Sequence, residues 1–425
     1  MSTSFPDVKI LYSFKANTNE HIIDTVMDNG LGCDAASSHE VWKATIAGFP
    51  AKDIYYSAPG KSVEDIESTI GMCNIIADSL EEIRLIDSLA ERKGMHVGIG
   101  VRINPDFGFG KKGASPSKFG VDEKELIGFL SDERLSHVSI EGIHVHLKSQ
   151  CLDPFDIREY YINMMGLAER VMEHIDLSYV DMGSCIGIPY SGSDEPLDLK
   201  ALGERSSEMF SSFRRAHKDT ELLIESGRYV TCDAGVYVTK VMDVKNSRGK
   251  TFVILRNTLN GFARPSIAHV VSASDPNARP CEPLFTSSDA FGLEVIDPAE
   301  EKQTVTIAGN TCTSADIVAE DVVMPEMRKG DVIIMTNAGS YGYVLTPLQF
   351  GSLDRPLEFF IDNDGNVVDS YTRKIDDVLS FDLWGRGMAS LENELGKDGA
   401  KRFLDMMSLN MQDYTRWRKD NRSDL

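Results

Sequence analysis

The stretch Leu11-Tyr-Ser-Phe-Lys-Ala-Asn-Thr-Asn19 brings a single lysine to the end of an apolar run. The run predicts a buried strand over residues 9–14, and the chain turns directly after Lys15. Burial of an ammonium group is costly, so a lysine at this point predicts a use for its amine. A desolvated lysine loses its proton more easily, which suits Schiff-base chemistry with an aldehyde cofactor. An ion-paired lysine at a strand end is the structural alternative.

Apolar runs and amphipathic stretches alternate along the first half of the chain. Predicted strands occupy residues 9–14, 32–35, 54–57, 74–77, 97–103, 140–146, 179–182 and 222–225. Predicted helices occupy residues 20–29, 38–47, 63–71, 79–93, 123–130, 156–174 and 198–217. This alternation predicts a (β/α)8 barrel, and an open sheet with helices on both faces is the alternative. Polar residues such as Lys15, Asp34 and Glu225 follow the strands, at the barrel end that carries active sites.

The second half of the chain is rich in short runs of β type. Predicted strands occupy residues 236–245, 251–255, 304–308, 331–335, 342–344 and 357–361, bounded by Gly, Pro, Asn or Asp. This pattern predicts an antiparallel β-barrel or sheet domain. The charged tail predicts helices at 389–395, 399–407 and 411–419. The predicted domains are therefore an α/β barrel over 1–235, an antiparallel β-barrel over 236–378 and a helical tail over 379–425.

The net charge and the cysteine content of the chain indicate which partners and which cellular compartment to expect. A formal net charge of −22 over 425 residues argues against nucleic acid or an anionic membrane as a partner. No apolar run in the sequence reaches the length of a bilayer span, and no signal-peptide pattern precedes Lys15. The seven cysteines are odd in number and far apart, without the rhythm of metal ligands. These features predict a reduced, cytoplasmic protein.

Two histidines and several glycine-punctuated loops are candidates for a site. The strand in Gly142-Ile-His-Val-His-Leu-Lys-Ser-Gln150 places His144 and His146 on one side, but no suitable third ligand is near in sequence, so we predict no metal. A simple hydrogen-bonded histidine is the alternative for His146. The loop Gly183-Ser-Cys-Ile-Gly-Ile-Pro-Tyr190 can bring N–H groups near a phosphate, although an ordinary turn has the same pattern. Ile224-Glu-Ser-Gly-Arg-Tyr229 places a carboxylate and a guanidinium around one glycine after an apolar run, which favours a buried position.

Eight motifs, in this order, resemble those of the fold-type III pyridoxal-phosphate decarboxylases, the family of diaminopimelate and ornithine decarboxylases. They are Tyr-Ser-Phe-Lys-Ala-Asn (12–17), Val-Arg-Ile-Asn-Pro (101–105), Ser-Lys-Phe-Gly (117–120), Gly-Ile-His-Val-His-Leu-Lys-Ser-Gln (142–150), Glu-Ser-Gly-Arg-Tyr (225–229), Asn-Gly-Phe-Ala-Arg-Pro (260–265), Cys-Thr-Ser-Ala-Asp (312–316) and Gly-Ser-Tyr-Gly (339–342). The motifs come nearest to those of the butirosin-type glutamyl-carrier-protein decarboxylases. The resemblance implies a (β/α)8 barrel followed by a β-barrel domain, in a homodimer with shared active sites.

The resemblance also implies pyridoxal 5'-phosphate as the cofactor. The residues that it assigns to cofactor binding are Lys15, Asp34, Arg102, His146, Ser149, Gly183, Cys185, Glu225, Gly227, Arg228 and Tyr341. Lys15 would bind the aldehyde as a Schiff base, Glu225 would pair with the pyridine nitrogen, and His146 would stack on the ring. Ser149, Arg228 and Tyr341 would hold the phosphate, together with N–H groups of the 183–187 loop.

Catalysis and substrate binding involve residues of the second half. The resemblance implies that Cys312 of the neighbouring subunit is the second catalytic residue and returns a proton to the substrate carbon. It places Arg256, Arg264, Thr313 and Asp316 toward the substrate. Diaminopimelate decarboxylases carry an acidic residue in the position of Thr313. Because a buried distal ammonium needs an anion, Thr313 and the two arginines favour an amino-acid substrate whose far end is neutral or acidic, glutamate-like or bound to a carrier protein.

Other interpretations stay open at this point. A diaminopimelate or basic amino-acid decarboxylase is the main alternative. An amino-acid racemase is disfavoured, because racemases of this type set an arginine and not a carboxylate such as Glu225 against the pyridine nitrogen. A cofactor-binding protein without turnover is suggested only by the unusual glycine loop at 183–187. Lys148, which stands where a glycine is usual, is either an added phosphate ligand or a solvent-facing lysine.

Overall fold

Eight parallel strands close into a barrel in this computed structural model, which describes residues 1–369 except 111, 279 and 288. The strands are β1 (Val8–Ser13), β2 (Gly32–Ala35), β3 (Ile54–Ser57), β4 (Asn74–Ala77), β5 (Val97–Asn104), β7 (Val138–His144), β8 (Tyr179–Asp181) and β9 (Glu221–Ser226). Each pairs with the next in chain order, and β9 pairs with β1 to close the ring. The two-residue strand β6 (Val121–Asp122) joins the edge of β5. The prediction of a (β/α)8 barrel is confirmed, and the open sheet is wrong.

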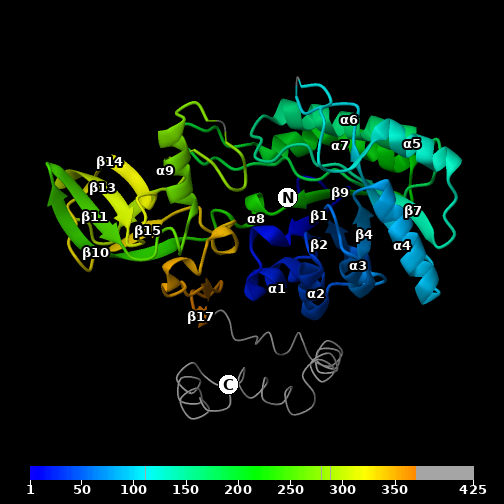
Figure 1. Cartoon of the computed structure of the whole chain (residues 1–425). Helices are drawn as coiled ribbons and strands as arrows, with labels where there is room; N and C mark the ends of the chain where they lie inside the picture. The colour runs from blue at the N-terminus through cyan, green and yellow to red at the C-terminus, as the bar shows by residue number, and fades with distance from the viewer. Residues whose placement is uncertain (111, 279, 288, 370–425) are drawn as a thin grey trace, which may run out of the picture. The chain divides into compact units, whose positions relative to one another are not determined.

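Helices alternate with the barrel strands, as Figure 1 shows for the blue and cyan part of the chain. They are α1 (Glu20–Asp28), α2 (Ser38–Ala47), α3 (Val63–Thr69), α4 (Leu80–Lys93), α5 (Glu123–Asp132), α6 (Pro154–Met172) and α7 (Leu199–Ala216). Local sequence sets their ends. Ser62 and Asp65 form a capping box at the start of α3, and Gly94 ends α4 in the left-handed conformation that glycine favours.

A second sheet follows the barrel in the chain. Its strands are β10 (Tyr237–Ser247), β11 (Lys250–Leu255), β12 (Leu293–Val295), β13 (Lys302–Gly309), β14 (Ile317–Pro325) and β15 (Val332–Met335), in the spatial order β12-β15-β10-β11-β13-β14. The β11–β13 pair is parallel, so the sheet is mixed and not purely antiparallel as predicted. Within the described residues no pairing joins β12 to β14, the two ends of this order. Helix α9 (Arg264–Ser274) lies beside this sheet in Figure 1.

Several details of the second half differ from the predictions, which also lack the short strands β12 and β17 (Val367–Asp369). The predicted strand at 342–344 is instead part of the 3-10 turn η3 (Tyr343–Leu345), because the Thr346 hydroxyl donates to the Gly342 carbonyl and curls the chain. Strand β14 was not predicted, since Glu320 and Asp321 interrupt its apolar pattern. Helix α9 was not predicted either, because its β-branched residues are weak helix formers.

The remaining short elements are η1 (Phe14–Ala16), η2 (Ala51–Asp53), α8 (Arg228–Thr231), η4 (Phe350–Ser352) and the hairpin of β16 (Phe359–Ile361) with β17 (Val367–Asp369). Of these, η1 and α8 directly follow the barrel strands β1 and β9, η2 precedes β3, and the others follow the second sheet. The predicted tail helices lie outside the described residues, and the domain limits at 235 and 378 stay predictions. No helix of the described part is both long and apolar enough to cross a membrane.

Candidate active site

Lys15 stands on η1, the single turn that ends strand β1. Its ammonium donates to Oδ2 of Asp34 on β2, at 2.7 Å. Burial by itself lowers the pKa of Lys15, but the carboxylates of Asp34 and Glu225 outweigh this effect and raise the pKa above its ordinary value. The side chain is also 44% exposed. The expectation of a desolvated lysine that loses its proton easily is therefore wrong for the cofactor-free chain, because two carboxylates hold the proton in place.

Two later segments of the chain pack against the Lys15 turn. The backbone N–H of Tyr341 donates to the Ala16 carbonyl at 2.7 Å, and the side chain of Asn17 donates to the Gly339 carbonyl at 2.8 Å. A Cβ placed on Gly227 would lie 2.7 Å from Cβ of Ala16. Tyr341 has φ of 57°, a strained conformation for a residue with a side chain, of the kind that clusters at functional sites.

Gly227→Ala should therefore destabilise the protein and disturb Lys15. The added methyl group must push apart two backbone turns, and overpacking of this kind costs about 1–3 kcal/mol. Chemical denaturation measures the loss, and a titration with pyridoxal phosphate measures the weakened site. Gly192→Ala is the matched control, since nothing lies within 4 Å of a Cβ placed there. Equal stability and equal cofactor affinity of the two variants would contradict the close packing.

A buried carboxylate, Glu225, ends strand β9 beside two other polar residues of the barrel interior. Its Oε1 lies 3.2 Å from Nε2 of His144, in an orientation that makes no hydrogen bond. Burial, and next the charge of Glu225, raises the pKa of Asp181 well above its ordinary value. One ligand atom from each of these three residues lies within 4.8 Å of the other two. Sequence spacing did not reveal this group, because its members come from three strands; the prediction that the site holds no metal stays a prediction.

His146 lies next to Glu225 and is fixed as a neutral imidazole. Its Nδ1 accepts from the Ser184 N–H at 3.1 Å, so the ring proton of the neutral form is on Nε2, which lies 3.2 Å from the Ser149 hydroxyl. Burial lowers the pKa of His146 to about 4, although the charge of Glu225 acts in the opposite direction. A neutral, flat ring held from both nitrogens suits contact with another aromatic ring.

Stability should consequently fall as the pH drops from about 6.5 toward 4. The unfolded chain binds a proton at His146 near pH 6.5, whereas the folded chain does so only near pH 4. The contribution is complete above pH 6.5 and is lost across this window. Because 27% of the side chain is exposed, screening reduces it, and we expect about 2 kcal/mol.

His146→Gln should flatten the unfolding free energy measured by urea denaturation between these pH values. His144 also has a pKa lowered by burial and acts in the same direction, so the difference between wild type and variant isolates His146. His39→Gln, at an exposed position of α2, is the matched control. Parallel pH profiles for all three proteins would refute the assignment.

Gly183 makes the turn that follows strand β8. Its φ is +56°, and a Cβ there would lie 2.5 Å from the Val145 carbonyl oxygen, so both conformation and space require glycine. The Gly183 N–H donates to Asp181 at 2.8 Å. The side chain of Cys185 lies in the barrel core, where burial raises its pKa, so this residue can offer a ligand only its backbone. Three N–H groups of the 183–187 loop, those of Gly183, Ser184 and Gly187, thus already donate within the protein.

Two buried arginines meet next to the Lys15 turn. Arg228 begins α8, directly after Gly227, and Arg264 begins α9. Both donate to the Tyr190 hydroxyl, at 2.6 and 3.1 Å, and both form ion pairs with Glu282. Burial lowers the pKa of Arg228, but Tyr190 and Glu282 more than compensate, so the guanidinium stays charged. Tyr190 belongs to a motif singled out in the sequence, whereas no pattern pointed to Glu282.

Arg102 lines the opposite part of the barrel mouth. Its guanidinium lies 4.2 Å from the centre of the Phe119 ring and 3.9 Å from Oδ1 of Asp78. Phe119 belongs to the Ser-Lys-Phe-Gly motif, and the Gly120 N–H donates to Asp78 at 3.1 Å. Arg102 therefore connects strand β5 to this loop. Lys148, the residue of uncertain role, is exposed.

Cys312, Thr313 and Asp316 share the loop after β13, where they differ in exposure. Cys312 is exposed at the tip of the loop after β13. Asp316 is buried, and its two oxygens accept from Thr258, Leu259, Ser266 and Thr311. Asp316 therefore joins the 309–316 loop to the 258–266 segment, and its predicted role as a substrate ligand stays a prediction. The Thr313 hydroxyl accepts from the Ala315 N–H in the same loop.

Arg256, whose substrate-binding role stays a prediction, lies at the surface. Its side chain is 53% exposed and pairs with Asp354 at 2.8 Å. Arg264, in contrast, is fully buried and already bound to Glu282. Each of these two arginines thus has a carboxylate partner within the chain, and Arg264 shares its partner with Arg228.

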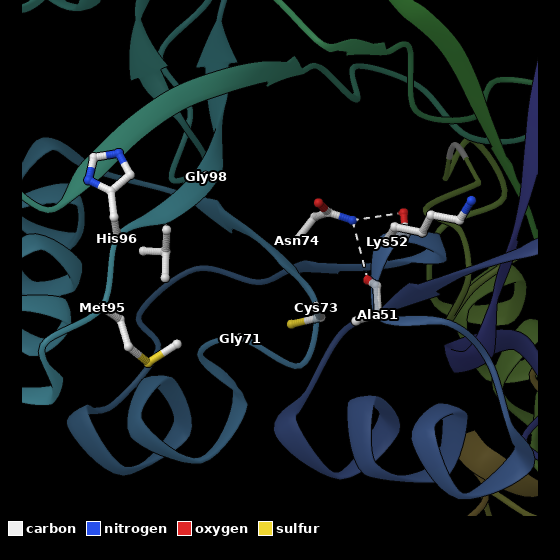
Figure 2. Close-up of a pocket in the computed structure, with 9 residues that line it drawn as sticks. Ala51, Lys52, Gly71, Cys73, Asn74, Met95, His96 and Gly98 are labelled. Atoms are coloured by element: carbon white, nitrogen blue, oxygen red, sulfur yellow. Dashed lines mark hydrogen bonds between the residues drawn. The ribbon is translucent and has the colours of Figure 1, made fainter.

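A pocket of about 260 Å³ lies at the other end of the barrel and is not part of this site. Figure 2 shows its lining residues, which come from segments that precede or begin β3, β4 and β5. The side chain of Asn74 donates to the Ala51 and Lys52 carbonyls there, which ties two of these segments together. The amino ends of barrel strands carry stability and not catalysis.

The groups at the carboxyl end of the barrel fit pyridoxal phosphate. They supply a primary amine for the aldehyde, a buried carboxylate for the pyridine nitrogen, a neutral imidazole for the ring and guanidinium groups for the phosphate. Oδ1 of Asp34 and Nε of Arg264 are buried without a hydrogen-bond partner among the described residues, as expected where a polar ligand binds. The fold and the site define a barrel enzyme of the pyridoxal-phosphate-dependent class.

Known proteins narrow this class to one family. Residues 1–232 match the pyridoxal-binding domain of the pyridoxal-dependent decarboxylases. The chain is 31% identical over 392 residues to the L-glutamyl-[BtrI acyl-carrier protein] decarboxylase of Niallia circulans, which covers 90% of this chain and 89% of that protein. It is 27% identical over 372 residues to the diaminopimelate decarboxylase of Aquifex aeolicus, with 85% and 82% covered. The diaminopimelate decarboxylase of Helicobacter pylori complexed with L-lysine has the same fold, with a TM-score of 0.74, 26% identity and 90% and 93% covered. The chain belongs to the pyridoxal-dependent decarboxylases, a family of carboxy-lyases.

Proposed function

We propose that this enzyme removes the α-carboxylate of an amino acid whose far end is uncharged, such as a glutamyl group linked to a carrier protein. The observation that carries this proposal is the state of the groups predicted to face the substrate. Asp316 has no free oxygen for a distal ammonium, and Arg256 and Arg264 are both paired with carboxylates. The site therefore offers little to a charged far end of either sign, because an unpaired charge is expensive to bury. One relative, which is 31% identical to this chain, is named for the decarboxylation of such a carrier-linked substrate.

The residues of the barrel have distinct roles in this proposal. Bound pyridoxal phosphate supplies the electron-accepting ring that lets carbon dioxide leave. Lys15 binds the aldehyde, and Asp34 orients its amine. Glu225 holds a proton on the pyridine nitrogen, and His146 covers one face of the ring. Arg228 and Tyr341 bind the phosphate.

Cys312 returns the proton to the substrate carbon in a partner subunit. Its thiol is exposed at the tip of a loop, where a second chain can reach it, in contrast to five of the other cysteines, which are buried or half-buried. The proposed assembly is a homodimer with shared sites. We also propose a cytoplasmic location, which the seven free cysteines favour.

Carbon dioxide release from a substrate panel tests the function. The panel contains carrier-linked glutamate, free glutamate, meso-diaminopimelate, lysine and ornithine, each assayed with the pyridoxal-phosphate-loaded enzyme. We expect the carrier-linked substrate to react fastest and the diamino acids slowest. A Lys15→Ala enzyme gives the background rate. Efficient turnover of meso-diaminopimelate alone would refute the proposed substrate and leave the decarboxylase assignment intact.

A further inference from the structure

Glu282 occupies the centre of the arginine pair. It comes from the segment between α9 and β12, and its side chain is 4% exposed. Oε2 of Glu282 accepts from both Arg228 and Arg264, and the Tyr190 hydroxyl accepts from both arginines as well. The resulting cluster of Arg228, Arg264 and Tyr190 is called the anion receptor below. Two guanidinium groups converge on one carboxylate oxygen, and the Tyr190 hydroxyl bridges the same two arginines.

The fit between Glu282 and the anion receptor is incomplete. Both guanidinium groups converge on Oε2, while Oε1 of Glu282 and Nε of Arg264 are buried without a hydrogen-bond partner among the described residues. Two guanidinium charges face a single carboxylate charge in these ion pairs. A dianion, or a carboxylate that uses both oxygens, would satisfy more of these donors, because guanidinium groups bind such anions best with two parallel hydrogen bonds.

The segment that carries Glu282 lies partly at the surface. The backbones of Cys281 and Phe285 exchange two hydrogen bonds and close a short loop, and Glu282 is one of the residues of this loop. Cys281 is exposed, and the side chain of Leu284 is 52% exposed, so the loop lies at the surface while Glu282 points inward. Phe285 anchors one end of this loop in the core of the second sheet, so the release of Glu282 involves the exposed part of the loop at Cys281 and Leu284.

We propose that Glu282 is an internal competitor for the anion receptor and determines which anions bind there. A phosphate or carboxylate group of a ligand enters only when it displaces Glu282. The apparent affinity for the anion is then the intrinsic affinity multiplied by the fraction of molecules in which the receptor is free. The identification of the anion as the cofactor phosphate or the substrate carboxylate rests on the proposed function. The competition itself does not, since it needs only the residues described.

Calorimetric titration of the cofactor-free protein with inorganic phosphate tests the competition. Glu282→Gln keeps the shape of the side chain and removes its charge, so we expect it to bind phosphate roughly tenfold more tightly than wild type. Phosphate should also raise the unfolding temperature of this variant more than that of wild type, since the variant leaves two buried guanidinium groups without a counter-charge. Glu294→Gln on β12 is the matched control, because it changes the net charge equally at an exposed position.

Two pairs of ligands identify the source of the anion. If the receptor serves the cofactor, Glu282→Gln should bind pyridoxal phosphate more tightly than wild type does, but should bind pyridoxal with unchanged affinity. If it serves the α-carboxylate of the substrate, the variant loaded with pyridoxal phosphate binds an amino acid more tightly than wild type does, but not the corresponding amine without the carboxylate. Either result supports the proposal. Should Glu282→Gln fail to fold, Glu282→Asp keeps the charge on a shorter side chain and should show a smaller gain in phosphate affinity. Phosphate affinities that match those of wild type and Glu294→Gln would overturn the proposal, whatever the outcome of the substrate panel.

Discussion

Lys15→Ala should abolish both decarboxylation and the covalent attachment of pyridoxal phosphate to the chain. Lys15 supplies the amine at the carboxyl end of the barrel that is within 2.7 Å of Asp34 and is influenced by Glu225. Removal of the amine takes away both the anchor for the aldehyde and a group that can move protons, so we expect a loss of activity on the order of 10³-fold or more.

Borohydride reduction followed by mass spectrometry of the peptides locates the attachment. Wild type should yield an adduct on the peptide that contains Lys15, and the variant should yield none. Lys9→Ala is a matched control on the same strand: Lys9 pairs with Asp53 and should be dispensable for the adduct. The assignment fails if the Lys15→Ala protein still carries a reducible adduct at another lysine and retains turnover.

Mixing Lys15→Ala with Cys312→Ala should restore activity that neither variant has alone. In the proposed homodimer each site takes Lys15 from one subunit and Cys312 from the other. A mixed dimer then contains one site with both groups native and one site with neither. Random exchange of subunits in a twofold dimer should recover about a quarter of the wild-type rate.

Two measurements make the complementation decisive. Subunit exchange is verified with differently tagged chains, and the cofactor content of Cys312→Ala is measured by absorbance, since this variant should keep its cofactor. Absence of recovery after verified exchange would exclude shared sites. Loss of cofactor from Cys312→Ala would make Cys312 a structural residue.

The sequence predicted the barrel because its signals are local. All eight barrel strands were anticipated, and β2, β3 and β4 begin and end where the pattern placed them. An apolar run of four residues bounded by turns and followed by an amphipathic helix needs no distant information. The same holds for the glycine at 183, whose turn is set by its own φ of +56°. The motifs also led to the family, which the comparisons confirm.

The second half was harder to predict, since its pairing is less regular. Strand β14 contains Glu320 and Asp321, and the backbone of Asp321 has a positive φ, so no clean alternation marks it. The parallel β11–β13 pair cannot be inferred from two short apolar runs separated by a helix. In such a sheet, side-chain packing determines which strands pair, and local turn signals in the sequence do not.

Only the tertiary structure shows which charged side chains of the site are already paired with other residues of the chain. The sequence alone established a (β/α)8 barrel with Lys15, His146 and Glu225 at its carboxyl end, because residue type and strand position suffice for that. It could not show that Arg228 is bound to Glu282, 54 residues away, or that Asn17 donates to Gly339, 322 residues away. Nor could it show that the oxygens of Asp316 accept hydrogen bonds both from Thr311 in its own loop and from Thr258, 58 residues away. Whether a charged side chain is free or already paired depends on its neighbours in space, and burial makes that difference large because an unpaired charge has no water to stabilise it.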